Sequence, residues 1–80
     1  MIRDMEHLYH WGWDCVCAAD PIPEGGFRAI VICKSLVSGH IPQSLVDGLV
    51  HETVEQSLRR AREVAVNWIH EHRYGLQNSH

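Results

Sequence analysis

The chain has 80 residues, of which 45% are hydrophobic, and a formal net charge of −3 at pH 7. A domain of this size buries only about 60% of its unfolded surface, so association with a partner would add to its stability. The acidic balance argues against nucleic acid as a partner, because binding to phosphates needs a basic surface. No run of about 18 apolar residues occurs, so we expect no membrane span. Three cysteines cannot complete a disulfide framework, which favours a reducing cytoplasm.

The first strand is predicted to follow a polar segment. Residues 1–7 are expected to be loose, whereas residues 8–19 (LYHWGWDCVCAA) are rich in aromatic and strand-favouring types. In residues 20–26 (DPIPEGG), two prolines and two glycines predict a hairpin loop. Alternation along this strand gives one apolar face, made of Trp11, Trp13, Cys15 and Cys17.

The second strand is predicted over residues 27–37 (FRAIVICKSLV), the segment with the strongest strand character. A hairpin that closes with Ala19 opposite Phe27 would place Cys15 opposite Val31. We expect the C-terminal helix to cover this side of the sheet.

The other side of the sheet carries a second group of side chains, which we call the interaction patch. An apolar patch on the surface of a small domain is typical of a contact with a partner. We therefore expect this patch to bind a protein partner or a second copy of the chain, in a homodimer. The interaction patch consists of Val16, Ile30, Ile32, Arg28 and Lys34.

The middle of the chain has a weaker pattern. The letters SGHIP, residues 38–42, predict a turn because proline restricts the backbone. Residues 45–50 are interpreted as a short third strand, and a short helix capped by Ser44 is the alternative.

A C-terminal helix is predicted over residues 53–73. Thr53 and Gln56 have the spacing of a capping box, and Gly75 is expected to end the helix, leaving residues 74–80 as a loose tail. Apolar side chains at steps of three, four or one form a stripe that would cover the sheet. The stripe consists of Val54, Leu58, Ala61, Ala65, Trp68, Ile69 and His72.

The candidate metal ligands are Cys15, Cys17 and Cys33, with His10 or His40. Zinc requires a tetrahedron of four ligands, whereas a C-x-C pair on a flat strand holds its thiols about 7 Å apart, too far for easy chelation. We therefore expect buried, reduced cysteines and no cofactor, with a metal-binding protein as the alternative.

No arrangement of catalytic residues is recognisable. Serine, cysteine and histidine are present, but none lies in a known catalytic motif, and Asp14 is the only carboxylate within the first two predicted strands. An enzyme is therefore not expected, and the histidines are interpreted as structural. The arginines of the helix alternate with glutamates, which indicates a solvated face of mixed charge.

Two motifs resemble a known family: GGF-x-A before an apolar strand, and T-x-E-x-x-L-x-x-A-x-E-x-x-x-x-W in the helix. They resemble the N-terminal domain of HicB-type antitoxins and related small bacterial proteins. The resemblance implies a β-β-β-α fold and binding to a small toxin as protein partner. The matching positions are Gly25, Gly26, Phe27, Ala29, Thr53, Glu55, Leu58, Ala61, Glu63 and Trp68.

The sequence thus predicts one α+β domain over residues 1–80. It would consist of a three-stranded, mainly antiparallel sheet with one C-terminal amphipathic helix packed on one face. We expect a non-enzymatic protein-interaction module. The alternatives are a metal-binding protein that uses the three cysteines and a β-β-β-α RNA-binding domain.

Overall fold

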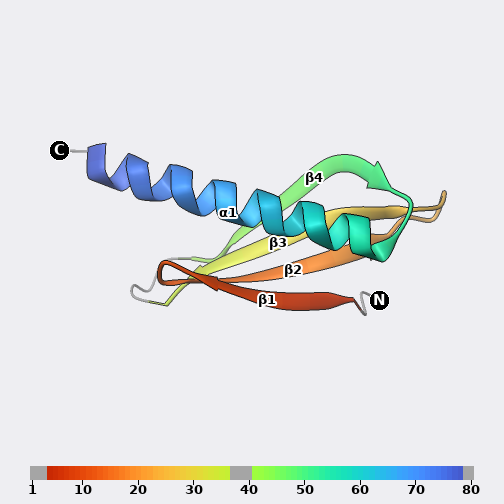
Figure 1. The fold of residues 1–80 in the computed structure, drawn as a ribbon, viewed down its shortest axis with the longest axis horizontal. Helices are drawn as coiled ribbons and strands as arrows, with labels where there is room; N and C mark the ends of the chain where they lie inside the picture. Colours follow the sequence, from red (N-terminus) through yellow and green to blue (C-terminus); the bar gives the residue numbers. More distant parts are fainter. Residues whose placement is uncertain (1–3, 37–40, 79–80) are drawn as a thin grey trace.

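The computed structural model describes residues 4–36 and 41–78, and the side chains of that part as far as Glu71. One antiparallel sheet of four strands, in the order β1-β2-β3-β4, is covered on one face by a single helix (Figure 1). The α+β class and the C-terminal helix are confirmed, but the prediction of three strands is wrong. The elements are β1 (Met5–His10), β2 (Trp13–Pro21), β3 (Phe27–Ser35), β4 (Gln43–His51) and α1 (Val54–Asn78).

The extra strand arises because the segment predicted as one strand, residues 8–19, is a hairpin. Trp11 and Gly12 have φ values of 49° and 81°. Two consecutive residues with positive φ are typical of a two-residue turn whose twist matches that of the flanking strands. Strand-favouring residues flank this turn on both sides. The amino-acid composition therefore does not change at the turn, and the sequence gives no sign of it. The segment predicted to be loose therefore contributes to β1 from Met5 onward.

The register between β2 and β3 differs from the predicted one by two residues. Ala19 lies opposite Ala29, and it is Pro21 that lies opposite Phe27. The ladder reaches Pro21 because the connecting loop is tight, with Ile22 N donating to Gly26 O at 3.0 Å. A shift of two residues keeps every side chain of β2 and β3 on its predicted face. The face of the cysteines is therefore still the one that α1 covers. Trp11, which was predicted on the apolar face of the first strand, instead lies in the β1–β2 turn.

The weakly predicted third strand exists as β4, and it is longer than the predicted residues 45–50. Its pairing with β3 is irregular, since Val46 lies opposite Ile30 and Val50 opposite Arg28. Residues 47–49 therefore stand opposite the single residue Ala29. A bulge of this kind bends a strand, and β4 arches away from its neighbour (Figure 1).

The predicted capping box begins α1. Thr53 Oγ1 accepts from Gln56 N at 3.1 Å, and Gln56 Oε1 accepts from Glu52 N at 3.1 Å and from Thr53 N at 3.3 Å. The predicted end at Gly75 is wrong, because the helix continues to Asn78. A glycine inside a helix costs only about 1 kcal/mol, and no proline follows to end it.

The core lies between α1 and the two central strands. Ala61 and Ala65 are fully buried and let the helix approach the sheet closely, while Ile69 fills the space beside them. Trp13 and Trp68 meet edge to face, with ring centroids 4.8 Å apart. His72 of the predicted stripe lies outside the side chains that the structure describes. The sheet contributes Cys15, Cys17, Ala29, Val31 and Cys33 to this core.

Within the described part of the chain, no helix combines the length and the apolar character that crossing a membrane requires.

Candidate interaction surface

The face of the sheet opposite α1, here called the open face, holds all five residues of the predicted interaction patch. Along β2 and β3, the residues next to them include Cys15, Cys17, Ala29, Val31 and Cys33, which are buried under the helix. Because successive side chains of a strand point to opposite faces, the patch residues point away from the helix. Val16 lies opposite Ile32 across the β2–β3 ladder. Ile32 is 43% exposed, whereas Val16 and Ile30 are half-buried by their neighbours. Arg28 and Lys34 are exposed.

The open face is wider than the sequence predicted. Met5, in the segment that was predicted to be loose, and Tyr9, in the predicted first strand, extend it on β1, and both are more than half exposed. Val46 and Val50 extend it on β4, at 58% and 62% exposure. The alternation of residues 5–10 was the available signal for β1, but six residues without a recognised turn are too short to distinguish from a polar tail.

Charged pairs lie at both ends of the apolar centre of this face. Asp14 is the cross-strand partner of Lys34, and Asp20 is the partner of Arg28. Arg28 Nη2 donates to Asp20 Oδ2 at 3.1 Å. At the other end, His7 Nδ1 lies 2.9 Å from Asp14 Oδ1. Each end therefore carries its acid on β2 and its base on β3.

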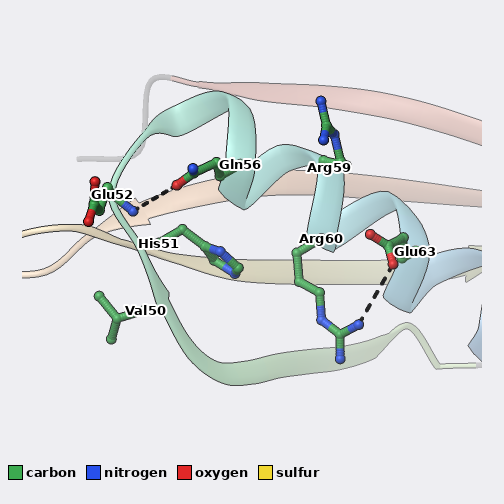
Figure 2. A pocket seen from close by; sticks show the side chains of 7 residues that line it. All are labelled: Val50, His51, Glu52, Gln56, Arg59, Arg60 and Glu63. Carbon is green, nitrogen blue, oxygen red and sulfur yellow. Dashed lines mark hydrogen bonds and ion pairs between the residues drawn. The ribbon is translucent and has the colours of Figure 1, made fainter.

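An open cleft of about 530 Å³ lies on the other side, between the arch of β4 and the first turns of α1 (Figure 2). Arg60 reaches into it and donates through Nε to Asp47 Oδ2 at 3.1 Å, which raises the pKa of the guanidinium. Arg60 Nη1 also lies 3.9 Å from Glu63 Oε2. Figure 2 shows Arg59 pointing away from Arg60, on the other side of the helix.

One histidine and one apolar side chain lie among the charged and polar residues that line the cleft. His51 Nε2 is buried and lies 3.9 Å from Asp47 Oδ2, beyond hydrogen-bonding distance. The side chains that line the cleft include no serine, threonine or cysteine to act as a nucleophile. Arg60 connects α1 to β4 through its hydrogen bond with Asp47. The cleft's lining consists of Val50, His51, Glu52, Gln56, Arg59, Arg60 and Glu63.

The three candidate metal-binding cysteines are free thiols with no exposed surface. Cys15 and Cys33 lie opposite each other, with their Sγ atoms 2.6 Å apart. Cys17 is separate, and its burial raises the pKa of its thiol to about 11. In residues 4–36 and 41–71, no group of three or more metal-ligating side chains could hold an ion. His40 lies outside the described residues, while His10 belongs to a different contact.

That contact joins the β1–β2 turn to α1. His10 Nε2 lies 3.2 Å from His70 Nε2, within hydrogen-bonding distance. The indole of Trp11 lies against both imidazoles, with ring centroids 4.7 Å from His10 and 4.2 Å from His70. The two histidines thus hold a turn that the sequence did not reveal against the helix.

No protein-family model matches this chain, and neither a curated protein nor a solved structure is significantly similar to it.

Proposed function

We propose that the protein is a non-enzymatic interaction module that forms a homodimer through the open face of its sheet. The observation that carries this proposal is the arrangement of charges on that face. The acids Asp14 and Asp20 lie on β2, and their basic partners Lys34 and Arg28 lie on β3. Apolar side chains occupy the area between them.

This arrangement is complementary to itself under two-fold symmetry. The two-fold axis lies between the two facing sheets, parallel to the strands and midway between β2 and β3. It places β2 of one copy over β3 of the other. Each side chain then meets, in the second copy, the residue that is its cross-strand partner within its own copy. Packed sheets cross at about 30°, so the central pairs come closest. The pairs that meet are Val16 with Ile32, Ala18 with Ile30, Asp14 with Lys34, and Asp20 with Arg28.

The size of the open face suits a dimer of moderate affinity. Its four strands have up to nine residues each. Strands lie about 4.8 Å apart and rise about 3.3 Å per residue, so the face measures roughly 20 by 30 Å, about 600 Å² in projection. A standard interface buries about 800 Å² per partner. We therefore expect a dissociation constant in the micromolar range rather than an obligate dimer.

A small domain also gains from such an association, because its own core is limited by its size. The resemblance to the N-terminal domain of HicB-type antitoxins supports the same class of function, since that family binds a protein partner.

Sedimentation velocity over a range of concentrations tests the dimer. We expect the wild type to shift from monomer to dimer at micromolar concentrations, and Ile30→Asp to remain monomeric because a buried carboxylate at the interface would be unpaired. Ile32→Asp, at a more exposed position of the same face, is a second variant in case the first fails to fold. The matched control is Ile41→Asp, at a side chain that is 80% exposed and outside β4. A wild type that stays monomeric at several hundred micromolar would refute the proposal.

A mixing experiment tests the symmetry itself. Asp14→Lys and Lys34→Asp each place like charges opposite each other in a homodimer, so each variant alone should dissociate. In a mixture, the two variants complement each other at both contacts of the two-fold interface, so a heterodimer should form. If the mixture is as monomeric as its components, the proposed packing of β2 over β3 is wrong.

A further inference from the structure

Cys15 and Cys33 occupy a special kind of position in the β2–β3 ladder. Leu36 N donates to Gly12 O at 2.8 Å at one end of this ladder, and Ile22 N donates to Gly26 O at 3.0 Å at the other. Hydrogen-bonded and non-hydrogen-bonded pairs alternate in an antiparallel ladder. Even-numbered residues of β2 therefore form the hydrogen-bonded pairs, and Cys15 with Cys33 forms a non-hydrogen-bonded pair.

A non-hydrogen-bonded pair brings its side chains close together. Its Cα atoms lie about 4.5 Å apart, which is within the range of about 4.4–6.8 Å that a disulfide can span. The Sγ atoms of Cys15 and Cys33 are 2.6 Å apart, whereas a disulfide bond measures about 2.05 Å. Both thiols are fully buried between the sheet and α1. Register and sulfur distance thus agree independently.

We propose that Cys15 and Cys33 form an intramolecular disulfide by exchange with a small-molecule disulfide of the glutathione type. One cysteine thiolate attacks the small disulfide, forms a mixed disulfide and releases one small thiol. The second cysteine thiolate then attacks the sulfur attached to the protein and releases the other small thiol. Two electrons pass from the cysteines to the small disulfide, and the two thiol protons end on the released thiols.

The surroundings of the pair support this chemistry. The hydrogen bond that Cys15 donates lowers the pKa of Cys33 and raises that of Cys15. In the folded protein Cys33 is therefore the more acidic of the two thiols. Because α1 covers both sulfurs in the folded protein, the exchange takes place during folding, before the helix packs on the sheet.

Cys17 is the matched control within the same core. It is fully buried on the same face of β2, but its cross-strand partner is Val31. Alternate residues of a strand lie about 7 Å apart, so Cys17 is too far from Cys15 for a bond without movement of the backbone. The structure therefore assigns the disulfide to one pair among the three possible pairs.

The test is refolding from urea with a mixture of reduced and oxidised glutathione, followed by alkylation and peptide mapping. Trypsin cleaves after Arg3, Arg28 and Lys34, so the bond should link residues 4–28, which contain both Cys15 and Cys17, to residues 29–34, which contain Cys33. Fragmentation of the linked peptide by tandem mass spectrometry then shows which of the two cysteines in residues 4–28 is alkylated. Cys17 should be the only alkylated cysteine, and dithiothreitol should restore all three thiols. We expect the oxidised protein to unfold at a urea concentration roughly 1–2 M higher, because the cross-link restricts the unfolded chain.

Variants decide which cysteines take part. Cys17→Ala should still form the bond, and Cys33→Ala should not. Three alkylated thiols in the refolded wild type, a glutathione adduct without a cross-link, or a bond that includes Cys17 would each overturn the proposal. Peptide mapping of the wild type gives this answer even if a variant fails to fold. The outcome is independent of the homodimer, because the cysteines lie on the face that α1 covers.

Discussion

The pair Gly25 and Gly26 allows a sharp test of how β4 closes over the β2–β3 hairpin. Both glycines have positive φ, at 112° and 88°. Alanine at either position is strained by the backbone conformation, at a cost of roughly 1–2 kcal/mol. The surroundings of the two positions differ. No heavy atom lies within 4 Å of the Cβ that alanine would add at position 25.

At position 26 the added Cβ would lie 2.7 Å from Val50 Cγ1 and 2.9 Å from the carbonyl oxygen of His51. Carbon atoms in contact normally lie about 3.5–4.0 Å apart. The side chain of Val50 can rotate, but the carbonyl belongs to the backbone at the end of β4. Such overpacking adds roughly 1–3 kcal/mol. We therefore expect a loss of roughly 1–2 kcal/mol for Gly25→Ala and roughly 2–5 kcal/mol for Gly26→Ala.

Urea unfolding followed by far-ultraviolet circular dichroism measures both losses. A domain of this length is stable by about 4–12 kcal/mol, so both variants should remain folded enough to measure unless the wild type lies at the low end. The slope of the free energy of unfolding against urea concentration should not change, because both variants expose the same surface on unfolding as the wild type. Equal losses for the two variants would show that β4 does not end against Gly26, and the placement of β4 would then be wrong.

Three further predictions concern the helix and the core. Ile69→Ala should lower the free energy of unfolding by about 2–5 kcal/mol, because Ile69 is fully buried. The exposed control Ile41→Ala should change it by less than about 0.5 kcal/mol. Similar losses for the two variants would contradict the packing of α1 on the sheet. Thr53→Ala and Gln56→Ala should each cost about 1 kcal/mol in thermal unfolding, since each removes hydrogen bonds of the helix cap, and an unchanged midpoint would argue against the cap. Stability should fall as the pH rises from about 9 to about 11, because the pKa of Cys17 is raised to about 11 in the folded state from an ordinary value near 9. The folded protein then holds a proton that the unfolded chain has lost, so this contribution is complete below pH 9 and is lost above pH 11, by roughly 2–3 kcal/mol. The alkaline slope should be smaller in Cys17→Ala, and an identical slope would refute this assignment.

Several features of the candidate surface were predictable because they depend on local alternation. Val16, Ile30 and Ile32 lie on one face in every antiparallel register that differs from the observed one by an even number of residues. The error of two residues in the predicted pairing therefore did not move them to the other face. The positions of Met5 and Tyr9 on the open face were not predicted, because β1 is short and the turn before β2 contains an unusual residue, Trp11, with positive φ.

The sequence by itself determined the helix, its cap and the faces that β2 and β3 turn to the core. These features follow from periodicity and from hydrogen bonds between residues close in the chain, such as Thr53 and Gln56. The end of the helix was predicted wrongly, because a local signal such as Gly75 shifts the helix–coil balance by only about 1 kcal/mol.

Only the tertiary structure decided the number of strands, the register and the curvature of β4. Register depends on how tightly each turn closes, and strand number depends on whether a turn is present at all. A shift of two residues leaves the hydrophobic pattern unchanged but replaces every cross-strand partner. The contact between Cys15 and Cys33 therefore appears only once the strands are paired, although the burial of both cysteines was already expected from their alternation.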